Sequence, residues 1–185
     1  MSRTTTSELS EPVDEERDHI QGPNEAPVTL LEYGDYECPY CGQAYPIIKE
    51  VQERLGNQLR FVFRNFPVRS MHPHAEHAAE AAEGAAVQGK FWEMHDHLYE
   101  HQDALEDDDL RDYADALDLD SEQFARELHE HVHEGRVEED IMSGARSGVN
   151  GTPTFFINGE RFDGNWTDVD VFVSAIEERI RSLEQ

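Results

Sequence analysis

The sequence predicts an α/β fold in which a series of helices is inserted between a β-α-β unit and a β-β-α unit. Three observations predict it. Short apolar runs typical of strands occur near residues 28–33, 59–64 and 154–157. Helical periodicity fills the chain between about residues 73 and 147, and an Asn-Gly turn at 158–159 joins two short strands. Strands separated by long helical patterns are typical of mixed α/β domains.

The β-α-β unit begins with the apolar run 28–33, which Gly34 and Asp35 end. Apolar residues then recur at helical spacing from Pro39 onward until the stop signal Gly56-Asn57. These residues are Ile47, Ile48, Val51 and Leu55. Leu59, Phe61 and Phe63 alternate with Arg60, Val62 and Arg64, and this alternation predicts the second strand.

Five helices are predicted between about residues 73 and 147. Their apolar positions are Ala75, Ala78, Ala79, Ala82 and Ala86; Phe91, Trp92, His95 and Leu98; Leu110, Tyr113, Ala114 and Leu117; Phe124 and Leu128; and Val137, Ile141 and Ala145. The alanines form a stripe that lets two helices approach closely. Asp120, three residues before Gln123, resembles an N-terminal cap.

The last part of the chain predicts a hairpin followed by a helix. Residues 154–157 and 160–162 flank Asn158-Gly159, which is a strong hairpin signal. The final helix has its apolar positions at Val169, Phe172, Ile176, Ile180 and Leu183, and we expect Thr167 to cap it.

The composition predicts one domain over residues 25–185, preceded by a disordered polar tail over residues 1–24. Asp and Glu number 41 against 15 Lys and Arg, so the net charge is −26. This charge excludes nucleic acid and anionic membranes as expected partners. Because the acidic residues are spread over the whole chain, we interpret them as a halophilic surface that salt screens.

Neither a membrane span nor the apolar core of a signal peptide is visible in the sequence. We therefore expect a cytoplasmic protein. The two cysteines lie three positions apart, so they do not staple a secreted scaffold.

Cys38-Pro39-Tyr40-Cys41 is the strongest candidate for chemistry. Disulfide exchange needs one thiolate to attack and a second thiol nearby to resolve the mixed disulfide. We expect a helix to start here, where backbone amides and the helix dipole would favour the thiolate of Cys38. Cys41, one turn further on, is expected to be more buried and to react second. Pro39 is tolerated in the first turn because its missing N–H has no partner there.

A metal site is the alternative role of these cysteines. Zinc or an iron–sulfur cluster would need further ligands, and there is no second cysteine pair. The ten histidines include three groups, namely His72, His74 and His77; His95, His97 and His101; and His129, His131 and His133. We interpret these groups as polar helix faces and predict neither a metal nor a separate cofactor, since the redox-active group is the Cys38–Cys41 disulfide.

Four blocks of sequence in this order resemble the DsbA-like branch of the thioredoxin superfamily over about residues 26–183. The blocks are LLEYGDYECPYC, RFVFRNFP, the Ala-rich run leading into GKFWEMHDHLYEHQ, and GVNGTPTFFINGERFDG. The resemblance implies a thioredoxin-like fold with a helical insertion. It also implies that Cys38 is the nucleophile and Cys41 the resolving cysteine.

The resemblance further assigns roles around this pair. Pro153 matches the cis-proline that faces the disulfide, and Thr152 offers backbone groups to an extended substrate. Glu32 falls where the family tends to keep a buried acid, which would carry protons to or from Cys41. A half-exposed strand glutamate without this role is the alternative for Glu32.

The resemblance implies a protein-disulfide oxidoreductase that acts on protein or peptide thiols and disulfides. Pro-Tyr replaces the Pro-His of strongly oxidising members, so we expect a reductase or general redox role, with a thioredoxin-reductase-type electron donor. Two alternatives remain at this point. One is a glutaredoxin-like, glutathione-dependent reductase, because Cys-Pro-Tyr-Cys is also a common glutaredoxin motif. The other is a non-catalytic, chaperone-like module that binds extended peptides around Pro153.

Overall fold

The structure is a computed structural model that describes residues 7–184, and it divides the chain into two compact units. The first unit contains the sheet and is built from the described parts of Met1–Gly34, Gln43–Arg64 and Ser143–Gln185. The second consists of Asp35–Gly42 and Asn65–Met142. We predicted one domain over residues 25–185 with a helical insertion, and the helical segment falls almost entirely in the second unit.

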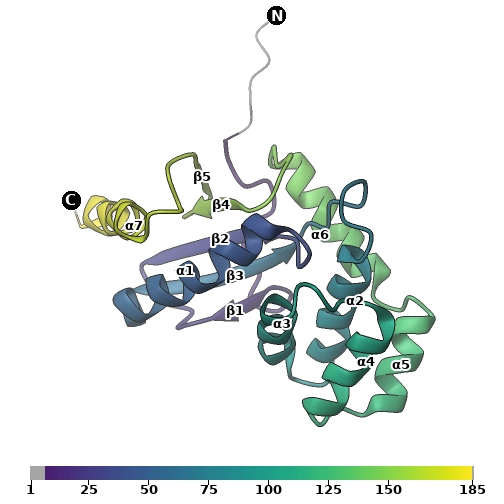
Figure 1. The fold of residues 1–185 in the computed structure, drawn as a ribbon. Coiled ribbons are helices and arrows are strands. Elements are labelled where there is room, and N and C mark those ends of the chain that lie inside the picture. Colours follow the sequence, from purple (N-terminus) through teal and green to yellow (C-terminus); the bar gives the residue numbers. More distant parts are fainter. Residues whose placement is uncertain (1–6, 185) are drawn as a thin grey trace, which may run out of the picture. The chain divides into compact units, whose positions relative to one another are not determined.

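Five strands form one mixed sheet in the order β1-β3-β2-β4-β5 (Figure 1). The strands are β1 (His19–Gln21), β2 (Val28–Gly34), β3 (Leu59–Asn65), β4 (Thr154–Ile157) and β5 (Glu160–Phe162). The central strand β2 is almost entirely buried. This burial explains why its sequence reads as a continuous apolar run instead of an alternating one.

Two helices of the first unit lie against the sheet (Figure 1). They are α1 (Pro39–Leu55), which a 3₁₀ turn at Gly56–Gln58 follows, and α7 (Val169–Leu183). Phe172 of α7 anchors that helix, because its ring stacks on Phe162 of β5 and meets Phe155 of β4 edge-on. Both helices occupy the predicted segments.

The β4–β5 hairpin has the predicted turn. Phe155 is opposite Phe162, and Ile157 is opposite Glu160. Asn158 and Gly159 have φ values of 48° and 83°, which is the left-handed backbone that an Asn-Gly hairpin turn requires.

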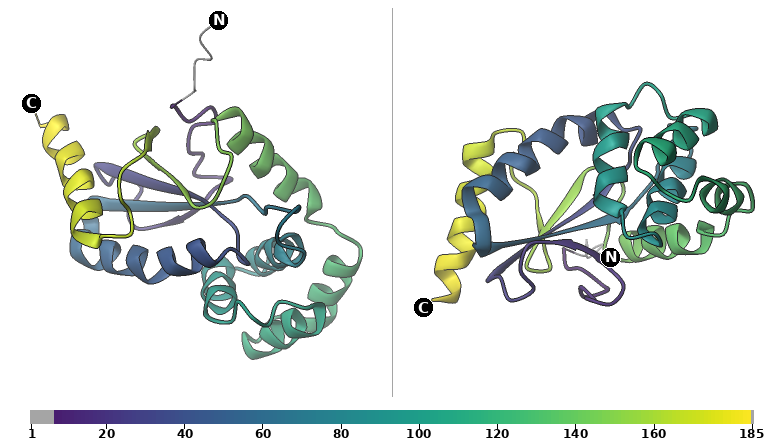
Figure 2. Two further views of the ribbon diagram at one scale, coloured as in Figure 1. Left: turned by 45° about the horizontal axis from the view of Figure 1, so that its top comes forward. Right: turned by 90° about the horizontal axis from the view of Figure 1, so that it is seen from below.

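The predicted helices of the middle segment are all present, and Figure 2 shows them in the teal and green part of the chain. They are α2 (Ala75–Ala86), α3 (Phe91–Glu100), α4 (Asp107–Ala116), α5 (Ser121–His129) and α6 (Glu134–Arg146). The alanine-rich helix α2 packs against both α3 and α5. Gly84 contributes to the close approach to α5, since a Cβ there would lie 3.3 Å from the ring of Phe124. None of the helices among residues 7–184 has the length and apolar character needed to cross a membrane.

The expectation of a disordered tail over residues 1–24 is wrong for residues 7–24, while residues 1–6 lie outside the described part. Residues 19–21 form β1, which pairs antiparallel with β3. Asp18 is buried and binds Arg64 through two hydrogen bonds of 2.9 Å. Backbone pairing and one buried ion pair hold this segment, and a composition-based prediction detects neither of them.

Residues 7–9, at the start of the described part of the chain, cover the outer edge of β5. Glu8 forms an antiparallel bridge with Glu160, and the backbone N–H of Leu9 donates to the carbonyl of Gly159 over 2.8 Å. The N–H of Arg161 donates to the carbonyl of Ser7 over 2.7 Å. Residues 7–9 therefore extend the hydrogen bonding beyond β5.

The helix caps were predicted correctly at one position and incorrectly at another. The side chain of Asp120 accepts from the backbone N–H of Gln123 and caps α5 as expected. For α7, the cap is Asp168, whose carboxylate accepts from the backbone N–H groups of Asp170 and Val171. Thr167 does not cap α7 because its hydroxyl bonds to the side chain of Asn165.

Candidate active site

The two cysteines lie where a helix begins. Helix α1 starts at Pro39, so Cys38 directly precedes its first residue and Cys41 lies in the first turn. The N–H of Gly42 donates to the carbonyl of Cys38 over 3.0 Å and closes that turn. The first turn itself contains no acidic residue; the nearest carboxylate contact is with Asp35, which accepts from the backbone N–H of Cys38.

Both cysteines are free thiols, and both are largely buried. Cys38 retains 4% of its surface and Cys41 retains none, so the expected order of burial is confirmed. Tyr40 between them is 64% exposed. The order of burial suits a first cysteine that meets the substrate and a second that attacks from within.

Asp35 holds the loop that leads into the cysteines. This buried carboxylate accepts through Oδ1 from the backbone N–H groups of Glu37 at 2.8 Å and of Cys38 at 3.2 Å. Oδ2 accepts from the backbone N–H of Val68 at 2.8 Å and lies 2.7 Å from Nδ1 of His72. One side chain therefore ties the loop at residues 35–38 to the segment that follows β3.

Gln102 holds the same loop from another side. Its Nε2 donates to the carbonyl of Tyr36 at 3.0 Å and to that of Cys38 at 2.9 Å. Gly42 leaves the space that this amide occupies, since a Cβ at position 42 would collide with it. The glycine directly after Cys41 thus has a packing function.

Two further histidine contacts brace the loop. Nδ1 of His74 lies 2.7 Å from a carboxylate oxygen of Glu37, and the backbone N–H of His74 donates to the other oxygen at 3.2 Å. The hydroxyl of Tyr36 lies 2.9 Å from Nδ1 of His95. Side chains from the helical segment therefore fix Tyr36 and Glu37, the two residues that precede Cys38.

The other predicted site residues belong to the first unit. The peptide bond between Thr152 and Pro153 is cis. Pro153 lines a cavity of about 390 Å³ together with Thr154, Arg161 and Trp166, among others. Glu32 lies in β2 opposite Phe155 and is only 3% exposed, so the alternative of a half-exposed glutamate is wrong.

Sequence reasoning missed Asp35 and Gln102. Asp35 carried a signal, because an aspartate shortly before a helix start commonly accepts from backbone amides two and three residues on. Gln102 carried none, since it follows α3 and lies 64 positions from the carbonyl of Cys38 that it binds.

The fold and the cysteine-bearing helix start define a thioredoxin-like protein of the DsbA-like thiol-disulfide oxidoreductase class. The model of the Thioredoxin family matches residues 14–178. The chain belongs to that family.

Solved structures share this fold over nearly the whole chain. The oxidised form of BdbD from Bacillus subtilis has a TM-score of 0.82 at 25% identity, covering 95% of this chain and 99% of that one. A thioredoxin-like oxidoreductase from Silicibacter pomeroyi DSS-3 has a TM-score of 0.77 at 24% identity, covering 98% and 99%.

The curated relatives that are similar in sequence to this chain are named as Na(+)/H(+) antiporters. Na(+)/H(+) antiporter NhaA 3 of Salinispora tropica is 51% identical over 169 residues, which are 91% of this chain and 26% of the antiporter. Na(+)/H(+) antiporter NhaA 1 of Mycobacterium sp. (strain KMS) is 47% identical over 171 residues, which are 91% and 28%. The chain thus spans about a quarter of the length of these relatives, and the name describes the longer proteins.

Proposed function

We propose that this chain exchanges disulfides with protein or peptide substrates through Cys38 and Cys41, in a reductase or general redox role. The observation that carries the proposal is the position of Cys38 directly before the first residue of α1, with Cys41 in its first turn. This arrangement supplies an attacking sulfur and a resolving sulfur within one helical turn.

The reaction in the reducing direction has two steps. The thiolate of Cys38 attacks one sulfur of a substrate disulfide, a mixed disulfide forms, and the other substrate sulfur leaves as a thiolate. Cys41, after losing its proton, attacks the sulfur of Cys38 and releases the second substrate thiol. Two electrons pass to the substrate, the Cys38–Cys41 pair becomes a disulfide, and a thioredoxin-reductase-type donor reduces it again.

Other residues have supporting roles in this proposal. Thr152 and Pro153 bind the extended substrate, and the cavity lined by Pro153 offers room for a substrate side chain. Glu32 exchanges protons with Cys41. Pro39 and Tyr40 set the environment of the pair, and Pro-Tyr in place of Pro-His supports a weaker oxidant.

The proposal is tested by insulin reduction in saline buffer. Cys38→Ser should abolish turnover, and Cys41→Ser should accumulate mixed disulfides. Retained turnover in Cys38→Ser would contradict the assigned roles. The reduction potential of the pair then decides the direction, because about 30 mV corresponds to 1.4 kcal/mol and oxidases and reductases differ by far more.

The glutaredoxin-like alternative and the peptide-binding alternative predict different experimental results. The match to BdbD over 99% of its length, helical segment included, supports the DsbA-like assignment over the glutaredoxin-like one. Turnover that depends on glutathione would reverse this preference. A peptide-binding module would keep its full peptide affinity in Cys38→Ser and would show no turnover in the unmodified protein.

A second candidate concerns the partner. Because the antiporters named above contain a region similar to this chain, we propose that a membrane Na(+)/H(+) antiporter is one substrate, with this chain on the cytoplasmic side. Cys41→Ser, incubated with membranes containing the Salinispora tropica antiporter without its matched region, should form a mixed disulfide. The Cys38→Ser/Cys41→Ser variant is the control, and equal labelling of both variants would refute this candidate.

A further inference from the structure

Among residues 7–184, one group of three histidine and carboxylate side chains lies close enough to share an ion. It consists of His77 and Glu80 on α2 and His131 in the turn between α5 and α6. One ligand atom from each lies within 4.8 Å of the others. The sequence had placed the two histidines in separate groups, and the fold brings them together.

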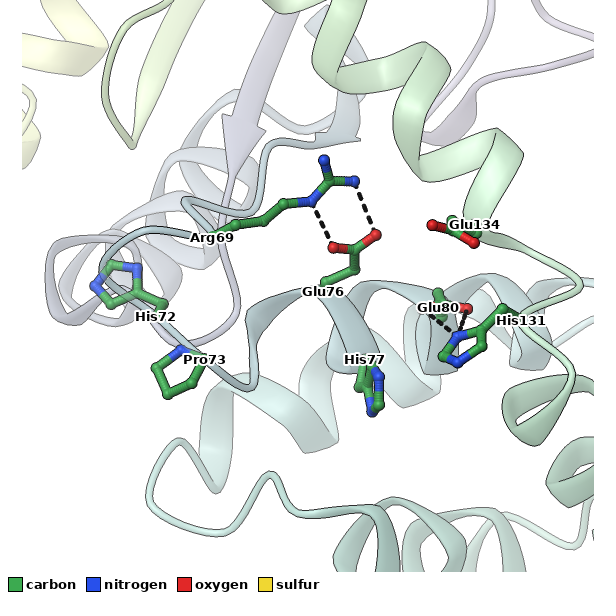
Figure 3. A pocket seen from close by; sticks show the side chains of 8 residues that line it. All are labelled: Arg69, His72, Pro73, Glu76, His77, Glu80, His131 and Glu134. Atoms are coloured by element: carbon green, nitrogen blue, oxygen red, sulfur yellow. Dashed lines mark hydrogen bonds and ion pairs between the residues drawn. The ribbon is translucent and has the colours of Figure 1, made fainter.

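The three side chains line an open pocket of about 280 Å³ (Figure 3). His77 and Glu80 are three residues apart on α2, so they lie on one face of that helix. The rings of His77 and His131 are 5.3 Å apart between centroids. Glu134 lines the same pocket and offers a further carboxylate (Figure 3).

The surroundings of His77 and of Glu80 favour ion binding for different reasons. Nδ1 of His77 lies 2.8 Å from Oδ1 of Asp107, which leaves Nε2 as the ligand atom and resembles the carboxylate–histidine pairs that orient metal ligands. The side chain of Glu80 is only 2% exposed, and its carboxylate oxygens lie 3.1 and 3.3 Å from Nδ1 of His131. A cation would compensate the buried charge of Glu80.

We propose that His77, Glu80 and His131 bind a divalent transition-metal ion of the Zn²⁺ type, with water or Glu134 completing the coordination. Two imidazoles and one carboxylate are a ligand set that Zn²⁺ accepts in tetrahedral geometry. Ligand atoms around Zn²⁺ lie about 2.0–2.2 Å from the ion, so the two half-exposed rings must move inward by about 1 Å. The ion would join α2 to the turn between α5 and α6.

The test measures binding of Zn²⁺ and of the spectroscopic substitute Co²⁺ by calorimetry and visible absorption. The full-length Cys38→Ser/Cys41→Ser protein is used, so that the thiols do not bind the ion. High NaCl and excess Mg²⁺ suppress nonspecific binding to the acidic surface. We expect one ion per chain and a melting temperature that rises on saturation.

Variants locate the site. His77→Asn and His131→Asn should each weaken binding by about tenfold or more, and Asp107→Asn by about tenfold through loss of the orienting contact. His129→Asn, an exposed histidine outside the group, is the matched control and should bind as the parent does. Unchanged affinity in His77→Asn/His131→Asn, or no ion bound by the parent, would overturn the proposal. Circular dichroism of each variant verifies the fold.

Discussion

The backbone N–H of Asp35 donates a hydrogen bond to Sγ of Cys41 over 3.5 Å. The carboxylate of Asp35 meanwhile accepts from the N–H of Cys38, so one residue contacts both cysteines. A donor that faces the sulfur suits the negative charge that Cys41 must carry when it attacks the mixed disulfide. Asp35 is therefore a positioning residue for the pair, and it directly follows β2.

The first prediction concerns Asp35→Asn. An amide has one acceptor oxygen, so it would present an NH₂ group to either the N–H of Cys38 or that of Val68. We expect a loss of about 1–3 kcal/mol in the free energy of unfolding, together with slower insulin reduction. Asp103→Asn, an exposed aspartate one residue after Gln102, is the control. Equal stability and rate for both variants would show that Asp35 does not hold the loop.

The second prediction compares two helical glycines. Gly42→Ala should displace Gln102 and break its bonds to the carbonyls of Tyr36 and Cys38, lowering both stability and exchange rate. Gly135→Ala in α6 meets no atom within 4 Å and should stabilise the protein by about 0.5–1 kcal/mol. The measurements are urea unfolding and insulin turnover.

A third variant separates the packing effect from helix propensity. Gln102→Ala removes the amide that a Cβ at position 42 would strike. In this background, Gly42→Ala should lose most of its penalty, so the two effects should not add. Additive effects would place the cause elsewhere in α1.

The third prediction concerns Asp18 and pH. Burial by itself would raise the pKa of Asp18, but the hydrogen bonds and charge of Arg64 outweigh it and hold the pKa below its ordinary value of 3.8. A lowered pKa in the folded state contributes stability above the unfolded pKa, and this stability is lost as the pH falls through the folded pKa. Unfolding free energy should therefore drop below about pH 4.

Asp18→Asn should remove this part of the pH dependence and destabilise the protein by about 3–5 kcal/mol at pH 7, because it leaves the buried charge of Arg64 uncompensated. Asp163→Asn breaks an exposed pair with Arg161 and should change stability by less than about 1 kcal/mol. Guanidinium unfolding at pH 7 and pH 3.5 measures both variants. A small effect of Asp18→Asn would mean that residues 7–24 contribute little.

The fourth prediction concerns salt. With a net charge of −26, the folded chain repels itself, and salt screens this repulsion. The melting temperature followed by circular dichroism should therefore rise steeply with NaCl. Sucrose stabilises without screening and is the control. A melting temperature independent of NaCl would refute the halophilic interpretation.

The sequence predicted most elements of the fold because their signals are local. Periodicity placed the helices and long strands, and Asn158-Gly159 placed the hairpin. It failed for β1, whose three residues are stabilised by β3 and by the ion pair of Asp18 with Arg64. It also failed at Thr167, because Asp168 was an equally good capping residue one position later.

The candidate site was predicted only in part for the same reason. The cysteine motif is contiguous and therefore visible in the sequence. Gln102 reaches the loop from 64 positions away, and His131 reaches Glu80 from 51 positions away. Contacts of this kind depend on how α2, α3 and α5 pack, and a single sequence contains no periodic signal for them.

The bridge between Glu8 and Glu160 has a consequence for self-association. An open edge strand is a template on which another molecule can add a strand, and such additions lead to swapped dimers and fibrils. Here β5 already has a neighbour from its own chain in residues 7–9, and the bridge places two carboxylates where an intruding strand would have to dock. Residues 7–9 thereby protect this side of the sheet against aggregation, a role that their composition does not indicate.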